Sequence, residues 1–284
     1  MVKVVDGKVI AGEIKQRVKE NISELMKKGY EEPCVATVKV GENKESNLFL
    51  NLKDKACVEV GVKPLHVEFP LDSSVDEIVC EINKLNSDEG VHGVVVQFPL
   101  PKHVSMHRVI SSINPAKDVE GLTPYNLGNL VMGEERTIPC TPLAVLKILE
   151  HENVKLEGAN VVIVNHSPVV GKPLDVLLLN RDATVTVCHV YTKDLKRHTK
   201  NADVLVVAAG VPGLITSEHV KEGATVIDVG ITKTSNGVKG DVVFDEVKKV
   251  AGIITPVPGG VGPVTVACFL ENMLKIYRNC VEEK

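Results

Sequence analysis

The stretch Ala159-Asn-Val-Val-Ile-Val-Asn-His-Ser-Pro-Val-Val-Gly-Lys-Pro173 decides the fold class of this chain. It begins with the β-branched run of a buried strand and continues with a loop that leads into a helix ending near Asn180. Apolar runs at 183–188, 203–209 and 224–230 predict three further strands. Strands that alternate with helices indicate a parallel, doubly wound α/β sheet of the kind that binds nucleotides.

The first half of the chain alternates in the same way. Strands are expected at 35–40, 64–69 and 91–98, and helices at 10–28, 46–60, 75–85 and 103–113. Ser73 or Ser74 is expected to cap the third of these helices, with Glu77 placed to complete a capping box.

The remaining segments are less regular. Residues 114–142 show no periodicity, so we interpret them as an irregular segment at an active site or between domains. A helix is expected to follow from Pro142 to His151. Short strands near Val242 and at 253–254, and a last helix at 264–279, complete the pattern.

The composition narrows the class of protein. The chain has 284 residues, enough for one large or two ordinary domains, and only 3% of them are aromatic. The core must therefore consist of Val, Ile, Leu and Ala, as in buried parallel sheets. The net charge of −4 argues against a nucleic-acid partner and against an anionic membrane surface. Long uncharged apolar runs are missing, so no transmembrane helix is expected.

The seven cysteines are odd in number and form no Cys-x-x-Cys pair. This usage is typical of thiols in a reducing cytosol, and it predicts neither a disulfide framework nor a metal site. The segment 1–7 is too short and too soon charged for a signal peptide, so we expect a cytoplasmic protein.

The helix expected at 46–60 carries a lysine inside its apolar face. At about 100° per residue, Lys53 lies in the middle of a face formed by Phe49, Leu52, Ala56, Cys57 and Val60. One interpretation is a snorkelling lysine, whose stem packs while its ammonium reaches water. The other is a partly desolvated lysine with a lowered pKa that performs acid–base chemistry in a cleft.

Three further segments have the residue types of a binding site. Gln97 ends a buried strand, where ligands of parallel sheets bind, although such a glutamine also commonly bonds to nearby backbone. Asp118 and Glu120 suit a donor-rich heterocycle or Lys53, although Asp118 could equally cap a solvated turn. The glycines of the Thr255–Thr265 loop would let a flat ligand lie against backbone, and an elaborate interdomain turn is the alternative.

The loop after the 159–164 strand is a weaker signal. A strand–loop–helix junction can receive a phosphate at the helix N-terminus. The G-x-G-x-x-G fingerprint is missing, however, and only Gly171 stands where a close approach is needed. This segment alone leaves nucleotide binding and a plain sheet turn equally open.

Several motifs, taken together, resemble one enzyme family. They are Phe-Leu-Asn-Leu-Lys-Asp-Lys-Ala at 49–56, Val-Val-Gln-Phe-Pro-Leu-Pro at 95–101, Pro-Ala-Lys-Asp-Val-Glu-Gly at 115–121, Ile-Pro-Cys-Thr-Pro at 138–142, Ser-Pro-Val-Val-Gly-Lys-Pro at 167–173, Val-Thr-Val-Cys-His at 185–189, Gly-Asp-Val at 240–242 and Thr-Pro-Val-Pro-Gly-Gly-Val-Gly-Pro-Val-Thr at 255–265. In this order they resemble the methylenetetrahydrofolate dehydrogenase/methenyltetrahydrofolate cyclohydrolase family, over nearly the whole chain.

The resemblance implies two α/β domains with parallel-rich sheets and a cleft between them. The N-terminal folate domain would comprise residues 1–139 and 264–284, since the last helix returns to it, and a Rossmann-like NAD(P)-binding domain would comprise residues 140–263. A homodimer is also implied. The implied reactions are the oxidation of 5,10-methylenetetrahydrofolate by hydride transfer to NADP and the hydrolysis of the methenyl product to 10-formyltetrahydrofolate.

The resemblance also implies roles for single residues. Lys53 would polarise the developing charge or relay a proton, Gln97 would hold its ammonium and bias its pKa, and Glu120 would accept hydrogen bonds from the pterin. The residues implied in contact with the folate are Phe49, Asp118, Pro258, Gly259 and Gly260. Those implied in contact with the cofactor are Asn165, His166, Ser167, Gly171, Val190 and Ile231.

The chain departs from the family pattern both at residues implied in the folate site and at residues implied in the cofactor site. Phe49 replaces a tyrosine and Glu120 an aspartate, which leaves open a monofunctional dehydrogenase with a weakened cyclohydrolase. His166 and Val190 replace an arginine and a serine that bind the 2′-phosphate of NADP, so the preference between NADP and NAD is open too. A non-catalytic folate or nucleotide binder is a third alternative, which the intact Lys53 disfavours.

Overall fold

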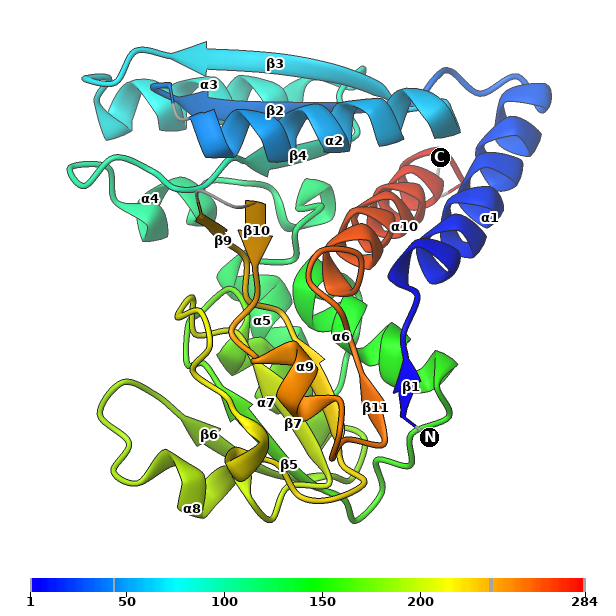
Figure 1. Cartoon of the computed structure of the whole chain (residues 1–284). Coiled ribbons are helices and arrows are strands. Elements are labelled where there is room, and N and C mark those ends of the chain that lie inside the picture. The colour runs from blue at the N-terminus through cyan, green and yellow to red at the C-terminus, as the bar shows by residue number, and fades with distance from the viewer. Residues whose placement is uncertain (1, 43, 235–236, 283–284) are drawn as a thin grey trace. The chain divides into compact units, whose positions relative to one another are not determined.

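The computed structural model describes residues 2–42, 44–234 and 237–282, with side chains for all of these except 44–49 and 234. The chain divides into two compact units, each with its own parallel sheet (Figure 1). Unit 1 contains Met1–Gly12, Leu130–Glu134 and Pro139–Thr265. Unit 2 contains Glu13–Asn129, Glu135–Ile138 and Val266–Lys284.

Unit 1 is built on a six-stranded sheet in which every neighbouring pair is parallel, so the doubly wound α/β sheet predicted for this part of the chain is confirmed. In spatial order the strands are β1 (Lys3–Val4), β11 (Ile253–Ile254), β8 (Thr225–Asp228), β7 (Val204–Val207), β5 (Asn160–Val164) and β6 (Thr184–Cys188). The other elements are α6 (Cys140–His151), α7 (Gly171–Leu179), α8 (Leu195–Thr199), η2 (Ser217–His219), the hairpin of β9 (Thr232–Thr234) and β10 (Gly237–Lys239), and α9 (Phe244–Val247).

The strand order of this sheet reverses beside β5. β6 pairs with one edge of β5 and β7 with the other, so the connection from β6 to β7 passes back across β5. In open parallel sheets, ligands bind outside the carboxyl ends of the strands at such a reversal. We therefore expect ligand contacts in unit 1 among the loops that follow β5, β6, β7 and β8.

Unit 1 also includes the first twelve residues, which the sequence-based boundaries assigned to the other domain. Lys3 and Val4 lie in parallel register with Ile253 and Ile254, and the N–H of Val5 donates to the carbonyl oxygen of Ile254 at 2.9 Å. A two-residue strand has no periodicity to detect, so only its pairing reveals it.

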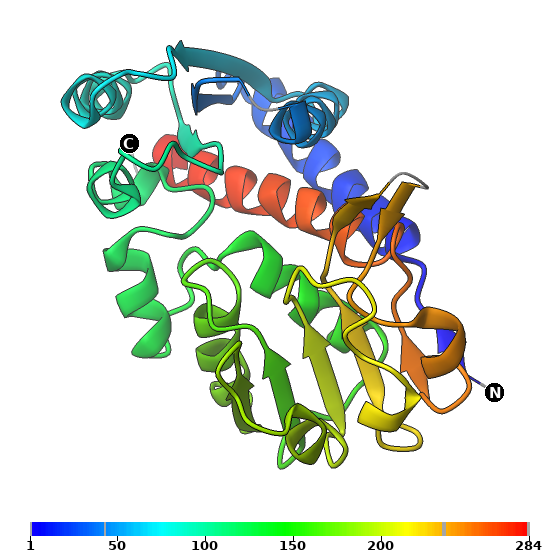
Figure 2. The same ribbon diagram turned by 60° about the vertical axis from the view of Figure 1, so that its left-hand side comes forward.

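Unit 2 is built on a smaller parallel sheet of order β3 (Lys63–Phe69), β2 (Cys34–Val40), β4 (Gly93–Val96). The connection from β2 to β3 runs through α2 (Lys44–Val60), and the return to β4 runs through α3 (Val75–Ser87) in the opposite direction. Right-handed connections in opposite directions place α2 and α3 on opposite faces of the sheet, as Figure 2 shows. The remaining elements are α1 (Gly7–Lys27), α4 (Met106–Ser111), η1 (Pro115–Lys117), α5 (Pro124–Val131) and α10 (Val261–Glu282).

Most of α10 packs within unit 2. The side-chain amide of Asn272 donates to the carbonyl oxygens of Val119 and Ile138, each at 2.9 Å, and the ring of Tyr277 meets that of His92 edge-on at 4.9 Å. These contacts explain why residues 266–284 cluster with unit 2. Neither α10 nor any other helix in the described part of the chain is long and apolar enough to cross a membrane.

Three expectations about individual elements are wrong. The strand expected at 91–98 is shorter and comprises only Gly93–Val96. On either side of it, His92 and Gln97 each donate one N–H to β2 without continuing the strand. Residues 124–131, expected to be irregular, form α5, where packing overrides the weak helix propensity of its Asn and Gly residues. The strand expected near Val242 is a single bridge to Ile215.

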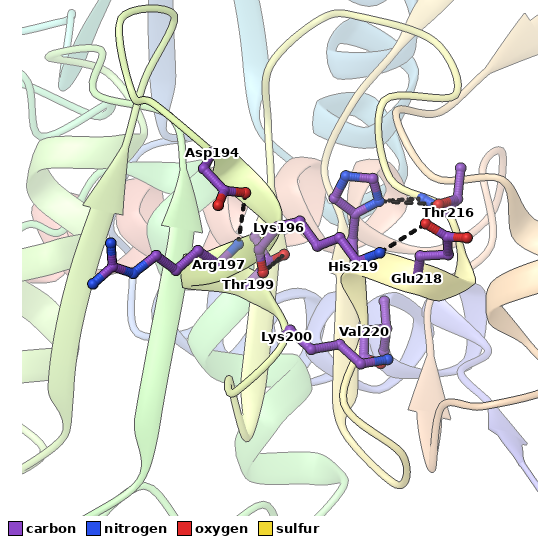
Figure 3. A network of polar contacts seen from close by, with 9 residues as sticks. All are labelled: Asp194, Lys196, Arg197, Thr199, Lys200, Thr216, Glu218, His219 and Val220. Atoms are coloured by element: carbon purple, nitrogen blue, oxygen red, sulfur yellow. Dashed lines mark hydrogen bonds and ion pairs between the residues drawn. The ribbon is translucent and has the colours of Figure 1, made fainter.

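Polar side chains fasten α8 to η2 inside unit 1, as Figure 3 shows. The ammonium of Lys196 lies 2.8 Å from the carboxylate of Glu218, and that of Lys200 donates to the carbonyl oxygen of Val220 at 2.9 Å. Asp194 begins α8 by accepting the N–H of Arg197. A five-residue helix is too short to be stable by itself, so these contacts hold it in place.

Ser74 caps α3, as predicted: its hydroxyl accepts the N–H of Glu77 at 3.2 Å, and the Glu77 carboxylate accepts the N–H of Ser74 at 2.8 Å. Ser74→Ala should lower the free energy of unfolding by about 1 kcal/mol, because the cap acceptor is lost. Urea denaturation measures the change. Ser87→Ala is the control in the same helix, since that hydroxyl bonds only to the carbonyl oxygen of Asn83. Equal losses in the two variants would contradict the capping role.

Candidate active site

Lys53 is held inside unit 2 by an ion pair. It lies on α2 and is 8% exposed, next to the buried Ala56 and Cys57. Its ammonium forms an ion pair with the carboxylate of Glu120 and lies 5.0 Å from the centre of the Phe269 ring. A snorkelling lysine would place its ammonium in water, whereas this ammonium is largely buried and paired with a carboxylate.

The loop that carries Glu120 is fixed by the neighbouring Asp118. Asp118 bridges to Val94 of β4 in parallel and is 1% exposed. Its Oδ2 accepts the N–H of Thr123 at 2.8 Å and the side-chain amide of Asn126 at 2.9 Å. Burial raises the pKa of Asp118, and these hydrogen bonds partly offset that rise. The Asp118 carboxylate, expected to contact substrate, is thus used to hold its own loop.

Gln97 directly follows β4, the strand that Asp118 bridges at Val94. Glu120 follows Asp118 in a turn, in which the N–H of Gly121 donates to the carbonyl oxygen of Asp118 at 3.3 Å. The side-chain amide of Gln97 donates to the carbonyl oxygen of Phe98 at 3.1 Å. Its Oε1 is buried and accepts no hydrogen bond from the described residues. An amide oxygen in this state is suited to accept from an ammonium or from a ligand N–H.

The sequence reasoning missed Phe269. It lies on α10, more than two hundred residues beyond Lys53, and its apolar helix face looks like ordinary core. An aromatic ring beside an ammonium stabilises the charge through its quadrupole. No local spacing could have indicated this contact, because only the fold brings the two helices together. The side chain of Phe49, the other aromatic of interest, lies outside the described residues.

In unit 1, Asn165 fixes the loop at the reversal of strand order. It follows β5, and its side-chain amide donates to the carbonyl oxygen of Ala208, just beyond β7, at 2.6 Å. Its Oδ1 accepts the N–H groups of Ser167 at 2.7 Å and Gly171 at 3.0 Å. The polar groups of Asn165, expected to bind cofactor, are thus engaged within the protein.

The N-terminus of α7 differs from the expected phosphate site. The N–H of Gly171 donates to Oδ1 of Asn165, and the N–H of Lys172 donates to the carbonyl oxygen of Ser167. Pro173 has no backbone N–H. A Cβ at Gly171 would lie 2.2 Å from the Asn165 carbonyl oxygen, so only glycine fits there. The glycine is therefore needed for close packing of α7 against the loop that precedes it.

Two histidines meet at the carboxyl ends of β5 and β6. The ring centres of His166 and His189 are 4.9 Å apart, and Tyr191 packs edge-on against His189 at 6.2 Å. The N–H of Tyr191 donates to Nδ1 of His189 at 3.2 Å. In the neutral ring this leaves the proton on Nε2, which can donate a hydrogen bond. Val190, which lies between His189 and Tyr191 in the sequence, is 82% exposed. Ile231, which follows β8, is also exposed.

The loop of Pro258, Gly259 and Gly260 lies against the start of α1 within unit 1. The N–H of Gly7 donates to the carbonyl oxygen of Gly259 at 3.0 Å. A Cβ at Gly7 would lie 1.9 Å from the carbonyl oxygen of Gly260, so a side chain there would displace the loop. Pro258 itself is exposed. Among the described residues, no cluster of His, Cys, Asp and Glu suits a metal ion.

Two family models match this chain. The catalytic domain of tetrahydrofolate dehydrogenase/cyclohydrolase matches residues 5–120, and its NAD(P)-binding domain matches residues 139–281. The sequence is 47% identical over 272 residues to the bifunctional protein FolD of Methanosarcina mazei, which covers 96% of this chain and 95% of that protein.

Solved structures agree with these matches. The crystal structure of bifunctional FolD, a methylenetetrahydrofolate dehydrogenase/cyclohydrolase from Campylobacter jejuni, has a TM-score of 0.96 at 44% identity and covers 98% of this chain and 99% of that chain. The methylenetetrahydrofolate dehydrogenase-cyclohydrolase of Trypanosoma brucei, complexed with NADP and an inhibitor, has a TM-score of 0.94 at 38% identity and covers 99% and 98%.

Cys57, one turn from Lys53, is not expected to act as a nucleophile. It is buried, and burial raises the pKa of its thiol to about 12, so it stays protonated. In the native protein, N-ethylmaleimide should label the exposed Cys80 and leave Cys57 unlabelled until the chain is unfolded. Peptide mass mapping measures both. Labelling of native Cys57 as fast as Cys80 would contradict this prediction.

Proposed function

Because this chain belongs to the tetrahydrofolate dehydrogenase/cyclohydrolase family, we propose that it catalyses both reactions named in that family. The first oxidises 5,10-methylenetetrahydrofolate with NAD(P) to 5,10-methenyltetrahydrofolate. The second adds water to the methenyl carbon and opens the ring to 10-formyltetrahydrofolate with release of a proton. The observation that carries the proposal is the buried ion pair of Lys53 and Glu120.

Lys53 is proposed to manage the proton of the water-addition step. A neutral amine can take a proton from the attacking water, and the ammonium can return one to the nitrogen that leaves the methenyl carbon. Burial favours the neutral amine, whereas the Glu120 carboxylate favours the ammonium.

Glu120 and Gln97 are proposed to position substrate and lysine. Glu120 contacts Lys53 through Oε1, which leaves Oε2 to accept N–H groups of the pterin. Gln97 offers its buried Oε1 to the ammonium or to the substrate. Asp118 is proposed to act through Glu120, by keeping the loop in one conformation. The monofunctional alternative rests on Phe49, whose side chain lies outside the described residues.

NADP is the proposed cofactor, and when bound it accepts the hydride. Dinucleotide-binding sheets that select NAD hold the ribose hydroxyls with a carboxylate at the end of the second strand. Here β6 ends with Cys188 and is followed by His189 and Val190, without a carboxylate. His166 and His189 instead offer imidazole N–H groups, which suit an additional phosphate.

A cytosolic homodimer without a nucleic-acid or membrane partner is proposed as the working form. The cytosolic location is supported by the seven cysteines, among which no disulfide bond is formed in the described residues. The net charge of −4 supports the absence of a nucleic-acid partner. The homodimer rests on the family resemblance.

Assays of purified protein test the proposal directly. Methylenetetrahydrofolate should be converted to the methenyl form with NADP, and more slowly with NAD, as followed by absorbance. Added methenyltetrahydrofolate should be hydrolysed faster than in buffer. Absence of turnover with both cofactors would refute the dehydrogenase, and hydrolysis at the buffer rate would refute the cyclohydrolase.

Lys53→Met should lower cyclohydrolase activity by about a hundredfold or more, because the proton relay is lost. Lys53→Met/Glu120→Gln should lose the same activity without leaving an unpaired carboxylate, so the two variants separate chemistry from stability. The exposed Lys55 gives the matched control, Lys55→Met, which should keep the activity of the parent protein. Unchanged hydrolysis in Lys53→Met would refute the role of the lysine.

His166→Arg should lower KM for NADP by about tenfold and leave KM for NAD unchanged, because a guanidinium is always charged and binds phosphate through two N–H groups. Steady-state kinetics with both cofactors measure the ratio. His198→Arg, at an exposed histidine of α8, adds the same charge elsewhere and should change neither value. An equal effect on NADP and NAD would show that His166 does not face the 2′-phosphate.

A further inference from the structure

Unit 1 buries two aspartates at the edge where its ligand is expected. Asp228 ends β8, and Asp241 follows the β9–β10 hairpin. Asp241 is 0% exposed, and Asp228 is also buried. Burial raises the pKa of both carboxyls, that of Asp228 to about 6. Burying a carboxylate costs free energy. We therefore expect the hydrogen bonds of both aspartates to fix backbone segments on which the fold or the site depends.

Asp228 joins the end of β8 to the segment that follows β10. Its Oδ1 accepts the N–H groups of Gly230 and Asp241, each at 3.0 Å, and its Oδ2 accepts that of Val242 at 3.0 Å. The N–H of Asp228 donates to the hydroxyl of Thr255 at 2.8 Å. Both carboxylate oxygens are therefore occupied, and Asp241 is fixed in position by Asp228.

Asp241 in turn holds both ends of the loop that leaves β7. Its Oδ2 accepts the N–H of Ala209 at 2.6 Å and that of Gly210 at 2.9 Å. Its carbonyl oxygen accepts the N–H of Ile215 at 3.0 Å. The loop 209–215 is thus tied at its start by the side chain and at its end by the main chain of one residue.

Asp241 also lies against the backbone of the next loop along the edge. A Cβ at Gly230 would lie 2.2 Å from the Asp241 carboxyl carbon, and a Cβ at Gly240 would lie 2.0 Å from Oδ2 of Asp228. Neither glycine can therefore carry a side chain without moving a carboxylate. The exposed Ile231 directly follows Gly230, so its position depends on this packing.

These contacts fix the loop after β7, which borders the strand reversal where a dinucleotide is expected to bind, and the neighbouring loop after β8. We propose that Asp241 is a positioning residue of the dehydrogenase: it holds the loop 209–215 and the Gly230 backbone in the conformation that receives the nicotinamide cofactor. This inference rests on the proposed function. It assigns Asp241 no contact with the cofactor itself.

The two aspartates should respond differently to replacement by asparagine. Oδ1 of Asp241 is buried without a hydrogen-bond partner among the described residues. An asparagine there can keep both N–H groups of the loop on its carbonyl oxygen and place its amide where Oδ1 was. At Asp228 both oxygens accept N–H groups, so an amide would face the N–H of Val242 and lose that bond.

The test uses the cyclohydrolase reaction as an internal control, because it needs no nicotinamide cofactor. Asp241→Ala should raise KM for NADP by about tenfold or more and weaken NADP binding, measured by calorimetry, to a similar extent. Hydrolysis of methenyltetrahydrofolate should stay within about twofold of the parent protein. Asp241→Asn should restore most of the NADP affinity. Asp245→Ala, at an exposed aspartate of α9, is the matched control and should change nothing.

Several outcomes would overturn the inference. Unchanged NADP affinity in Asp241→Ala would show that the loop needs no such restraint. Parallel loss of both reactions with a lowered melting temperature would show a role in stability alone. Asparagine as damaging as alanine would contradict the hydrogen-bonding role. If the parent protein turns over neither substrate, the proposed function fails, and NADP calorimetry on the same variants still decides the role of Asp241.

Discussion

The buried ion pair between Lys53 and Glu120 joins α2 to the loop after η1 in unit 2. Both charges are largely withdrawn from water, where an unpaired ammonium or carboxylate is costly. The pair therefore requires α2 and the loop after η1 to arrive together, and α10 adds the Phe269 ring beside the ammonium. Asp118 holds this loop in one conformation, because its carboxylate accepts hydrogen bonds from N–H groups of the loop.

Unit 1 is subject to a related constraint at the carboxyl ends of its strands. Loops that leave parallel strands carry backbone N–H groups that need acceptors once they are buried. Here the side-chain oxygens of Asn165, Asp228 and Asp241 accept them, in a chain that lacks the glycine-rich fingerprint of many dinucleotide-binding proteins. Glycines are placed where a carbonyl or carboxyl group lies against the backbone, as at Gly171 and Gly230. A backbone fixed in this way can receive a ligand without reorganisation.

Local patterns predicted the regular elements well, because apolar periodicity and capping are properties of neighbouring residues. The strands at 35–40 and 64–69, the helix at 46–60 and the cap at Ser74 were all found from such patterns. The failures share a cause. β1 is only two residues long, and α5 has weak helix propensity. Each forms because of its tertiary partners, so neither leaves a local pattern that could be detected in the sequence.

The sequence by itself determined the α/β class, the family resemblance and the unusual placement of Lys53, since each is written in residue order and spacing. Only the tertiary structure decided what the polar residues do. Asp118 and Asn165 were expected to contact ligands, and the fold places backbone N–H groups on Oδ2 of Asp118 and on Oδ1 of Asn165. Phe269 and Asp241 look like ordinary core and loop residues, and they matter because folding brings them to Lys53 and to the loop after β7. Hydrogen bonds and ion pairs between distant segments are decided by packing, which residue spacing does not encode.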